Sequence, residues 1–154
     1  RYAMGKLRFT FADGSYVIGS VLEKEEPECS AKIYELVANG PVRLACYNTV
    51  STGGFIAGFP RPPKEPVLAG TQVDGIGNHN KIIYDLIPGE ICWTGWNFWF
   101  SYLPNTEPVG IGGPVTVIID PEYMDTYIAA CNKIWENQYS EHVLPVIVVE
   151  KEDK

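Results

Sequence analysis

Glu107 and Glu90 flank an aromatic-rich segment and are the side chains best suited to proton transfer. Glu107 lies in the loop directly after that segment, and a carboxylate next to apolar rings can have its pKa raised toward neutrality. Such a group serves as a general acid or base near pH 7. Glu90 follows the turn Pro88-Gly89 and is a second candidate. The structural alternatives are a solvated loop acid for Glu107 and an ordinary turn residue for Glu90.

One cation and four polar residues stand next to turns rich in glycine and proline. Arg61 lies in the run Phe59-Pro60-Arg61-Pro62-Pro63, where a stiff backbone would hold the guanidinium ready for bidentate binding of a carboxylate. Its alternative is an ordinary exposed cation. The four polar residues precede Gly53-Gly54 at the end of a predicted strand, where they would line the mouth of a pocket or form a turn. They are Tyr47, Asn48, Ser51 and Thr52.

Large aromatic side chains are concentrated between residues 93 and 102, a stretch that holds three of the 4 tryptophans. An aromatic wall built from them would bind a planar or cationic ligand. Packing into the core is the alternative, because aromatic residues dominate burial in small β domains. The aromatic candidates for ligand contact are Trp93, Trp96, Trp99 and Tyr102.

Other common catalytic and cofactor motifs are absent from the sequence. His79 and His142 are far apart, with no cysteine or aspartate at metal-ligand spacing, so we expect no metal site. The glycine-rich runs at 74–77 and 110–113 lack the strand, loop and helix context that phosphate binding requires. There is no Gly-x-Ser-x-Gly elbow, and no cysteine lies in a catalytic signature. We therefore expect no cofactor.

The charge of the chain excludes some classes of partner. Its 12 basic and 19 acidic residues give a formal net charge of −7, which repels phosphate backbones and anionic membranes. No run approaches the roughly 20 apolar residues of a membrane span. We therefore expect neither nucleic acid nor a membrane as partner. The four cysteines stand singly, at Cys29, Cys46, Cys92 and Cys131. This spacing favours reduced thiols in the cytoplasm, and a disulfide is the alternative.

Alternating apolar residues and turn signals predict a mainly β chain. Asp13-Gly14 predicts a hairpin between strands at 6–11 and 16–22. Glycines and prolines at 51–54 and 59–63 predict a long irregular loop. We expect one domain over residues 1–154, in which residues 1–5 carry no function and Met4 is the native start. Further strands are predicted at 42–50, 81–86, 115–119 and 143–150, and a hairpin or bulged strand at 91–103.

Two helices are expected. Pro27 opens a short helix that ends at Asn39-Gly40. A longer helix is predicted over 120–139, because Asp120-Pro121-Glu122 combines an N-cap acceptor, a proline at the first helical position and an acid in the first turn. Its apolar face should be buried, either on the sheet or against a second copy of the chain in a homo-oligomer. That face consists of Met124, Tyr127, Ile128, Cys131, Ile134 and Trp135.

The order of these elements resembles a group of bacterial cyclophilin-like β-barrel proteins. The segment Glu90-Ile91-Cys92-Trp93-Thr94-Gly95-Trp96-Asn97-Phe98-Trp99-Phe100, followed by Thr106-Glu107-Pro108, is most similar to the barrel of the cucumopine synthase family. The helix after Asp120 resembles the start of that family's helical extension, although we expect this chain to lack the long bundle that follows there. The resemblance implies an antiparallel barrel with a short N-terminal helix and a longer C-terminal amphipathic helix.

The same resemblance implies metabolite chemistry without a redox cofactor. Cucumopine synthase joins histidine to a 2-oxo acid by imine formation and ring closure, a Pictet-Spengler reaction. None of its catalytic residues is matched to a position of this chain. The arginine-phenylalanine-glutamine signature of the prolyl isomerases is absent, so isomerase activity is not expected.

Two hypotheses of different classes follow. The first is a cofactor-independent synthase or lyase acting on a small amino or oxo acid, in which Glu107 or Glu90 moves a proton and Arg61 holds a carboxylate. The second is a non-catalytic barrel that binds a ligand or partner beside a metabolic enzyme. A titratable acid converging with Arg61 in one site would favour the enzyme.

Overall fold

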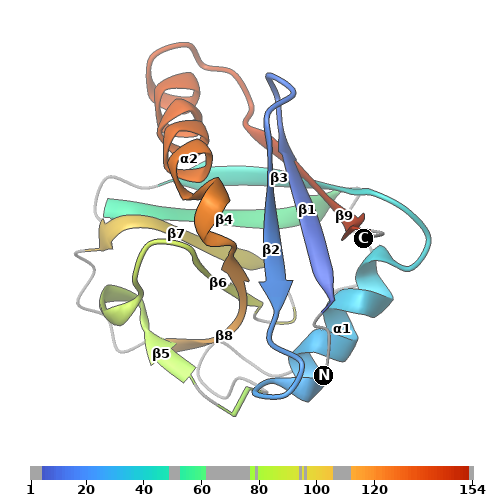
Figure 1. Ribbon diagram of the computed structural model, residues 1–154. Coiled ribbons are helices and arrows are strands. Elements are labelled where there is room, and N and C mark those ends of the chain that lie inside the picture. Colours follow the sequence, from blue (N-terminus) through green and yellow to red (C-terminus); the bar gives the residue numbers. More distant parts are fainter. Residues whose placement is uncertain are drawn as a thin grey trace.

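The strands of the chain close into a barrel. The computed structural model describes residues 5–48, 53–61, 77–78, 80–93, 95, 97–105 and 112–152, with Arg61 described by its backbone alone. Within these residues, a 9-stranded sheet runs in the order β2-β1-β9-β3-β4-β7-β6-β8-β5, and every pairing is antiparallel. The β2–β8 pairing closes the barrel, while β5 is added beside β8 (Figure 1). The predicted mainly β, antiparallel barrel is confirmed.

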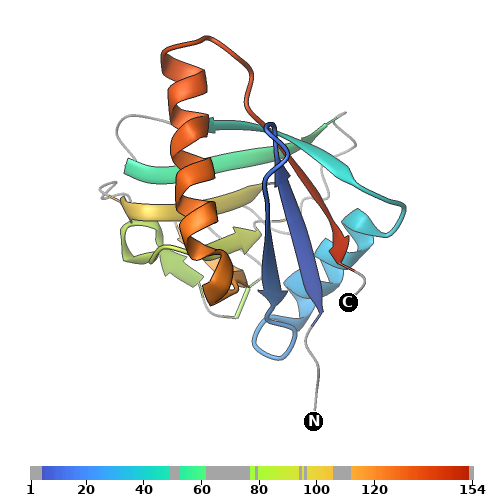
Figure 2. The same cartoon turned by 45° about the horizontal axis from the view of Figure 1, so that its top comes forward.

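The strands have the following bounds: β1 Lys6–Phe11, β2 Tyr16–Val21, β3 Val42–Asn48, β4 Gly53–Arg61, β5 Asn80–Ile82, β6 Glu90–Trp93, β7 Phe98–Asn105, β8 Gly112–Ile119 and β9 Val146–Glu152. The predicted hairpin joins β1 to β2. Gly14 has a φ of 91°, which glycine adopts without steric cost, and the Asp13 carboxylate accepts a hydrogen bond from the backbone N–H of Ser15 at 2.9 Å. The β1–β9 pairing places the first and the last strand of the chain side by side (Figure 2).

Alternate residues of the barrel strands fill its interior. Phe9 packs edge-on against Phe98 and Phe100, with ring centroids 6.1 and 5.5 Å apart. An eight-stranded barrel has an interior just wide enough for side chains. Further interior contacts come from α1 (Pro27–Val37) and α2 (Met124–Tyr139), which lie on opposite sides of the barrel in Figures 1 and 2.

The longer helix packs its apolar face on the barrel. It begins as a short 3₁₀ helix, η3 (Pro121–Tyr123), and continues as α2. Tyr127, Cys131 and Ile134 are buried, and α2 contacts β2, β3 and β7. The predicted burial is therefore confirmed for these three residues, with the barrel as the covering surface, whereas Met124, Ile128 and Trp135 are half-buried. Asp120 is the N-cap residue of η3, as predicted, but its carboxylate is not the expected capping acceptor. It accepts hydrogen bonds from Ser20 Oγ and Lys6 Nζ, at 2.6 and 2.8 Å, and makes no capping bond.

Two strand predictions need correction. The expected loop at 51–54 and 59–63 is in part the strand β4, in which a Cβ on Gly58 would lie 3.1 Å from Phe100 and 3.2 Å from Cys46. Glycine in this strand therefore reflects a close approach of the interior side chains rather than a turn. The predicted strand at 81–86 ends after Ile82, and the chain then forms the 3₁₀ helix η2 (Ile83–Asp85).

All four cysteines are free and buried, which removes the disulfide alternative. Burial raises the pKa of Cys29 to about 11 and that of Cys46 to about 12. Thiols that resist ionisation in this way make poor nucleophiles. No helix within the described residues is long and apolar enough to cross a membrane.

Candidate functional site on the outer face of the barrel

The register of the sheet aligns outward-facing residues in one row across five strands. Ala57 of β4 lies opposite Tyr47 of β3 and Trp99 of β7, and Trp99 lies opposite Cys92 of β6, which lies opposite Val115 of β8. Ala57, Trp99, Cys92 and Val115 belong to a buried cluster separate from the interior of the barrel. We call the outward surface of β3, β4, β7, β6 and β8 the outer face.

Aromatic rings form two groups on the outer face, on either side of Ala57. Tyr47 stacks on Phe59 with centroids 5.8 Å apart and planes inclined by 8°, and Tyr47 is 46% exposed. Trp99 meets Phe55 edge-on at 5.5 Å, and both are buried beneath Ile83 and Leu86. The outer face therefore offers one open aromatic surface and one covered aromatic cluster.

Arg61 ends β4 instead of lying in a proline-rich loop. Its backbone is in register with Arg43 of β3, and Phe59, two residues earlier in β4, carries one ring of the open stack. Arg43 is exposed and has no carboxylate partner among the described residues. Like charges directly opposite each other on neighbouring strands destabilise a sheet. Arg43 thus offers a guanidinium with no carboxylate partner among the described residues, and such a group is well suited to an anion.

Of the two predicted acids, the structure describes Glu90, whose carboxylate accepts hydrogen bonds from Lys81 and Ile87. Both carboxylate oxygens lie 3.0 Å from Lys81 Nζ, and Oε1 also accepts the backbone N–H of Ile87 at 2.9 Å. Glu90 lies two residues before Cys92 in β6 and thus borders the outer face. The carboxylate consequently links β5, β6 and the turn before β6.

Three of the predicted ligand contacts point into the barrel. Asn48 Nδ2 donates to the Tyr102 hydroxyl at 2.8 Å, and the Asn48 backbone is bound by Gln138 of α2. Burial raises the pKa of Tyr102 to about 12. Trp93 packs on Phe98 at 4.6 Å inside the barrel. Trp93 and Trp99 therefore lie on opposite faces of the sheet and do not form one aromatic wall, because side chains alternate along and between strands.

The remaining predicted site residues, Ser51, Thr52, Trp96 and Glu107, lie outside the described residues, as does His79. Within the described residues, no group of three or more His, Cys, Asp or Glu side chains is placed to hold a metal ion. Residues of the outer face that the sequence did not single out are Arg43, Phe59 and Asn105, all of them parts of strands without a recognisable motif.

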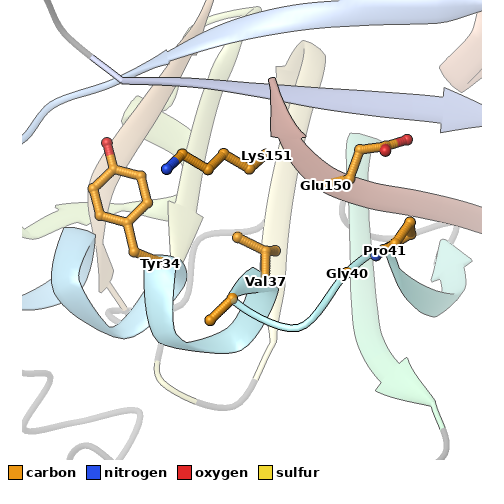
Figure 3. A pocket seen from close by; sticks show the side chains of 7 residues that line it. Tyr34, Val37, Gly40, Pro41, Glu150 and Lys151 are labelled. Atoms are coloured by element: carbon orange, nitrogen blue, oxygen red, sulfur yellow. The ribbon is translucent and has the colours of Figure 1, made fainter. Parts of the chain in front are cut away.

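A separate hollow lies between α1 and β9 and has a volume of about 420 Å³. It is lined by Tyr34, Val37, Ala38, Gly40, Pro41, Glu150 and Lys151, none of which was predicted as a site residue. Figure 3 shows the side chains of Lys151 and Glu150 extending in opposite directions, and the Tyr34 hydroxyl donates to Glu23. The polar groups of this hollow do not converge on one point, so the outer face is the better candidate site.

Comparison with known proteins supports the fold. No protein-family model matches the chain, and no curated protein matches its sequence. Among solved structures, the chain is similar to McbB in complex with tryptophan, with a TM-score of 0.78 and 15% sequence identity. The match covers 96% of this chain and 45% of the McbB chain. The chain thus has the fold of a part of McbB and spans less than half of its length.

Proposed function

We propose that this barrel is a small-molecule enzyme that acts on an amino or oxo acid at its outer face. The observation that carries the proposal is the juxtaposition of the Arg43 and Arg61 positions with the open Tyr47–Phe59 stack. Guanidinium groups bind carboxylates, and an aromatic surface binds planar groups next to them. The similarity in fold to McbB, whose structure contains an amino acid, supports a ligand of this class.

The chemistry we propose is redox-neutral condensation of the kind that the resemblance to cucumopine synthase implies. The amine attacks the carbonyl carbon of the oxo acid, and water leaves to give an imine. A ring carbon of the amine partner then attacks the imine carbon, and a base removes the ring proton. Arg61 would hold the carboxylate and Glu107 would transfer the protons, because Glu90 lies at the level of Phe55, roughly 20 Å from Arg61 along the strands. No cofactor is needed for this sequence of steps.

Binding and turnover of pyruvate and L-tryptophan test the proposal. Calorimetry should detect pyruvate binding that weakens roughly ten- to hundredfold in Arg61→Ala, because a charge-assisted hydrogen bond is worth about 1.5–3 kcal/mol. The matched control is Arg8→Ala, which removes an arginine bound to Glu152 elsewhere on the barrel. Mass spectrometry should find a product that weighs the sum of the two reactants less one water. Glu107→Gln should abolish that product and leave binding unchanged. Equal binding by wild type and Arg61→Ala would contradict the proposal.

A non-catalytic binding barrel is the second candidate, and the geometry of Glu90 favours it. Three hydrogen bonds already occupy this carboxylate, so it serves as a structural link between strands. The exposed Tyr47 ring suits binding without chemistry. Under this alternative, pyruvate or L-tryptophan binds and no condensation product forms.

A further inference from the structure

The hollow between α1 and β9 lies where β9 loses one of its two neighbouring strands. β3 pairs with β9 only as far as Val42 opposite Val149, whereas β1 follows the other side of β9 to Glu152. Glu150 and Lys151 line the hollow, which has a volume of about 420 Å³ (Figure 3). At these two residues β9 therefore has a strand neighbour on one side alone, within the described part of the chain.

Two residues before β3 keep the chain's own backbone away from this edge. Pro41 directly precedes the first residue of β3 and has no N–H to donate to a ladder. Gly40 has a φ of 124°, which glycine adopts without steric cost, and there the chain turns toward the end of α1. Both residues line the hollow together with Val37 and Ala38. The unpaired edge of a strand binds a further strand through main-chain hydrogen bonds.

The two β9 side chains at this edge carry opposite charges. Glu150 lies opposite Arg8 in the register, but the Arg8 guanidinium donates to Glu152, at 2.9 and 3.3 Å. Neither Glu150 nor Lys151 has an ion-pair partner among the described residues. Their side chains extend in opposite directions (Figure 3), as those of neighbouring strand residues do. A strand added here would therefore meet a carboxylate on one face and an ammonium group on the other.

The direction of such a strand fixes the order of charges that it needs. A strand in the place of β3 would run antiparallel to β9, as β3 itself does. Side chains directly opposite each other share a face of the sheet, and opposite charges attract there. In an antiparallel strand, the residue opposite Lys151 precedes the residue opposite Glu150. The first should therefore be acidic and the second basic.

The size of the hollow suits a short extended segment. Three extended residues span roughly 10 Å, and ligand pockets have volumes of about 300–1,000 Å³. Tyr34 is the other polar side chain of the lining, and its hydroxyl donates to Glu23. Charge recognition therefore depends on Glu150 and Lys151, while Val37 and the neighbouring backbone of α1 supply the opposite wall.

We propose that this hollow binds an extended peptide segment of a partner protein, in which an acidic residue is followed by a basic one. The segment adds to β9 in the place that β3 leaves, and the site is independent of the proposed catalytic function. A chain end or a loop can enter the hollow. A second folded copy cannot offer its own β9 edge, because that edge is recessed behind α1 in the same way.

Two synthetic peptides of identical composition test the proposal: acetyl-Ala-Glu-Arg-amide and acetyl-Ala-Arg-Glu-amide. Nuclear magnetic resonance titration of isotope-labelled protein measures weak affinities and locates the bound peptide. The Glu-Arg peptide should bind roughly five- to fiftyfold more tightly, because the reversed order replaces two attractive pairs by two like-charge pairs. The backbone amide signals of Glu150 and Lys151 should shift on binding.

Exchanging the two charges of the protein should reverse the preference. The double variant Glu150→Lys with Lys151→Glu should bind the Arg-Glu peptide more tightly. The matched control exchanges an exposed ion pair of α2, Lys133→Glu with Glu136→Lys, and should keep the wild-type preference.

The wild-type comparison stands even where the exchange alters folding. Equal affinity for the two peptides, binding of neither, or signal shifts confined to other strands would overturn the proposal. A wild-type dimer in sedimentation that binds neither peptide would assign the edge to a second copy instead. None of these results depends on pyruvate binding, which tests the proposed function separately.

Discussion

Replacing Arg43 by glutamine should stabilise the free protein while weakening its affinity for an oxo acid. The two effects have opposite signs because Arg43 and Arg61 lie directly opposite each other on β3 and β4. Such cross-strand positions have Cβ atoms about 5 Å apart, and like charges there cost about 0.2–1 kcal/mol. A Coulomb estimate agrees, since two unit charges about 7 Å apart in water repel by about 0.6 kcal/mol.

Urea unfolding measures the first effect. With a slope of about 1–3 kcal/mol/M, a gain of about 0.6 kcal/mol moves the midpoint upward by about 0.2–0.6 M. The gain should shrink in 0.5 M salt, because the Debye length falls below the separation of the charges. Pyruvate affinity, measured by calorimetry, should fall roughly tenfold in the same variant.

Arg8→Gln is the matched control for Arg43→Gln. Arg8 Nε donates to Glu152 at 2.9 Å, and its guanidinium lies 4.1 Å from the ring centroid of Tyr16. Removing this paired arginine should lower stability and leave pyruvate affinity unchanged. If Arg43→Gln behaved like Arg8→Gln, by losing stability and keeping its affinity, the reasoning that the arginine positions form an anion site would be refuted.

Three further predictions concern the scaffold. Tyr127→Phe should lower the free energy of unfolding by about 0.5–1.5 kcal/mol in urea titrations, because the buried hydroxyl donates to the Ser101 carbonyl at 2.9 Å. The control Tyr84→Phe, at an exposed ring, should have no effect. The free energy of unfolding should fall as pH rises above the ordinary thiol pKa of 9.0. Burial raises the pKa of Cys29 to about 11 and that of Cys46 to about 12 in the native state, so only the unfolded chain ionises at these thiols in this range. A urea midpoint that stays constant between about pH 8 and pH 10.5 would contradict this. Gly54→Ala should destabilise the protein more than Gly58→Ala, as measured by thermal unfolding of the two variants. The methyl group added at position 54 would lie 2.5 Å from the backbone of Leu103, whereas the one added at position 58 would lie 3.1 Å from the Phe100 side chain.

Local signals in the sequence were sufficient for several elements of the fold. Asp13-Gly14 determines the first hairpin through residues adjacent in the chain, and Pro27 marks the start of α1. The apolar face of α2 follows from helical periodicity. These features depend on a few neighbouring residues, which is why their sequence patterns predict them.

The strand β4 and the arrangement of the site could not be predicted in this way. Three glycines and a proline suggest a loop, yet Gly58 is required by Phe100 and Cys46, which come from other strands. The pairing of Arg43 with Arg61 follows from the register of β3 and β4, and the position of Asn105 follows from a bulge in β7. Each of these facts depends on contacts between distant parts of the chain, and no short motif encodes them.

The filling of the barrel is the reason why we propose a ligand site on its outer face. Large rings occupy the interior, with Phe9, Phe98 and Phe100 in mutual contact, and helices contribute further buried side chains. A ligand inside would have to displace these rings, and removing a buried phenylalanine from its contacts costs about 3–5 kcal/mol. The inward residues Asn48, Trp93 and Tyr102 accordingly belong to the packing that fixes the strands. In our proposal, recognition therefore falls to the opposite side of the same strands, where strand alternation places the exposed Tyr47 ring.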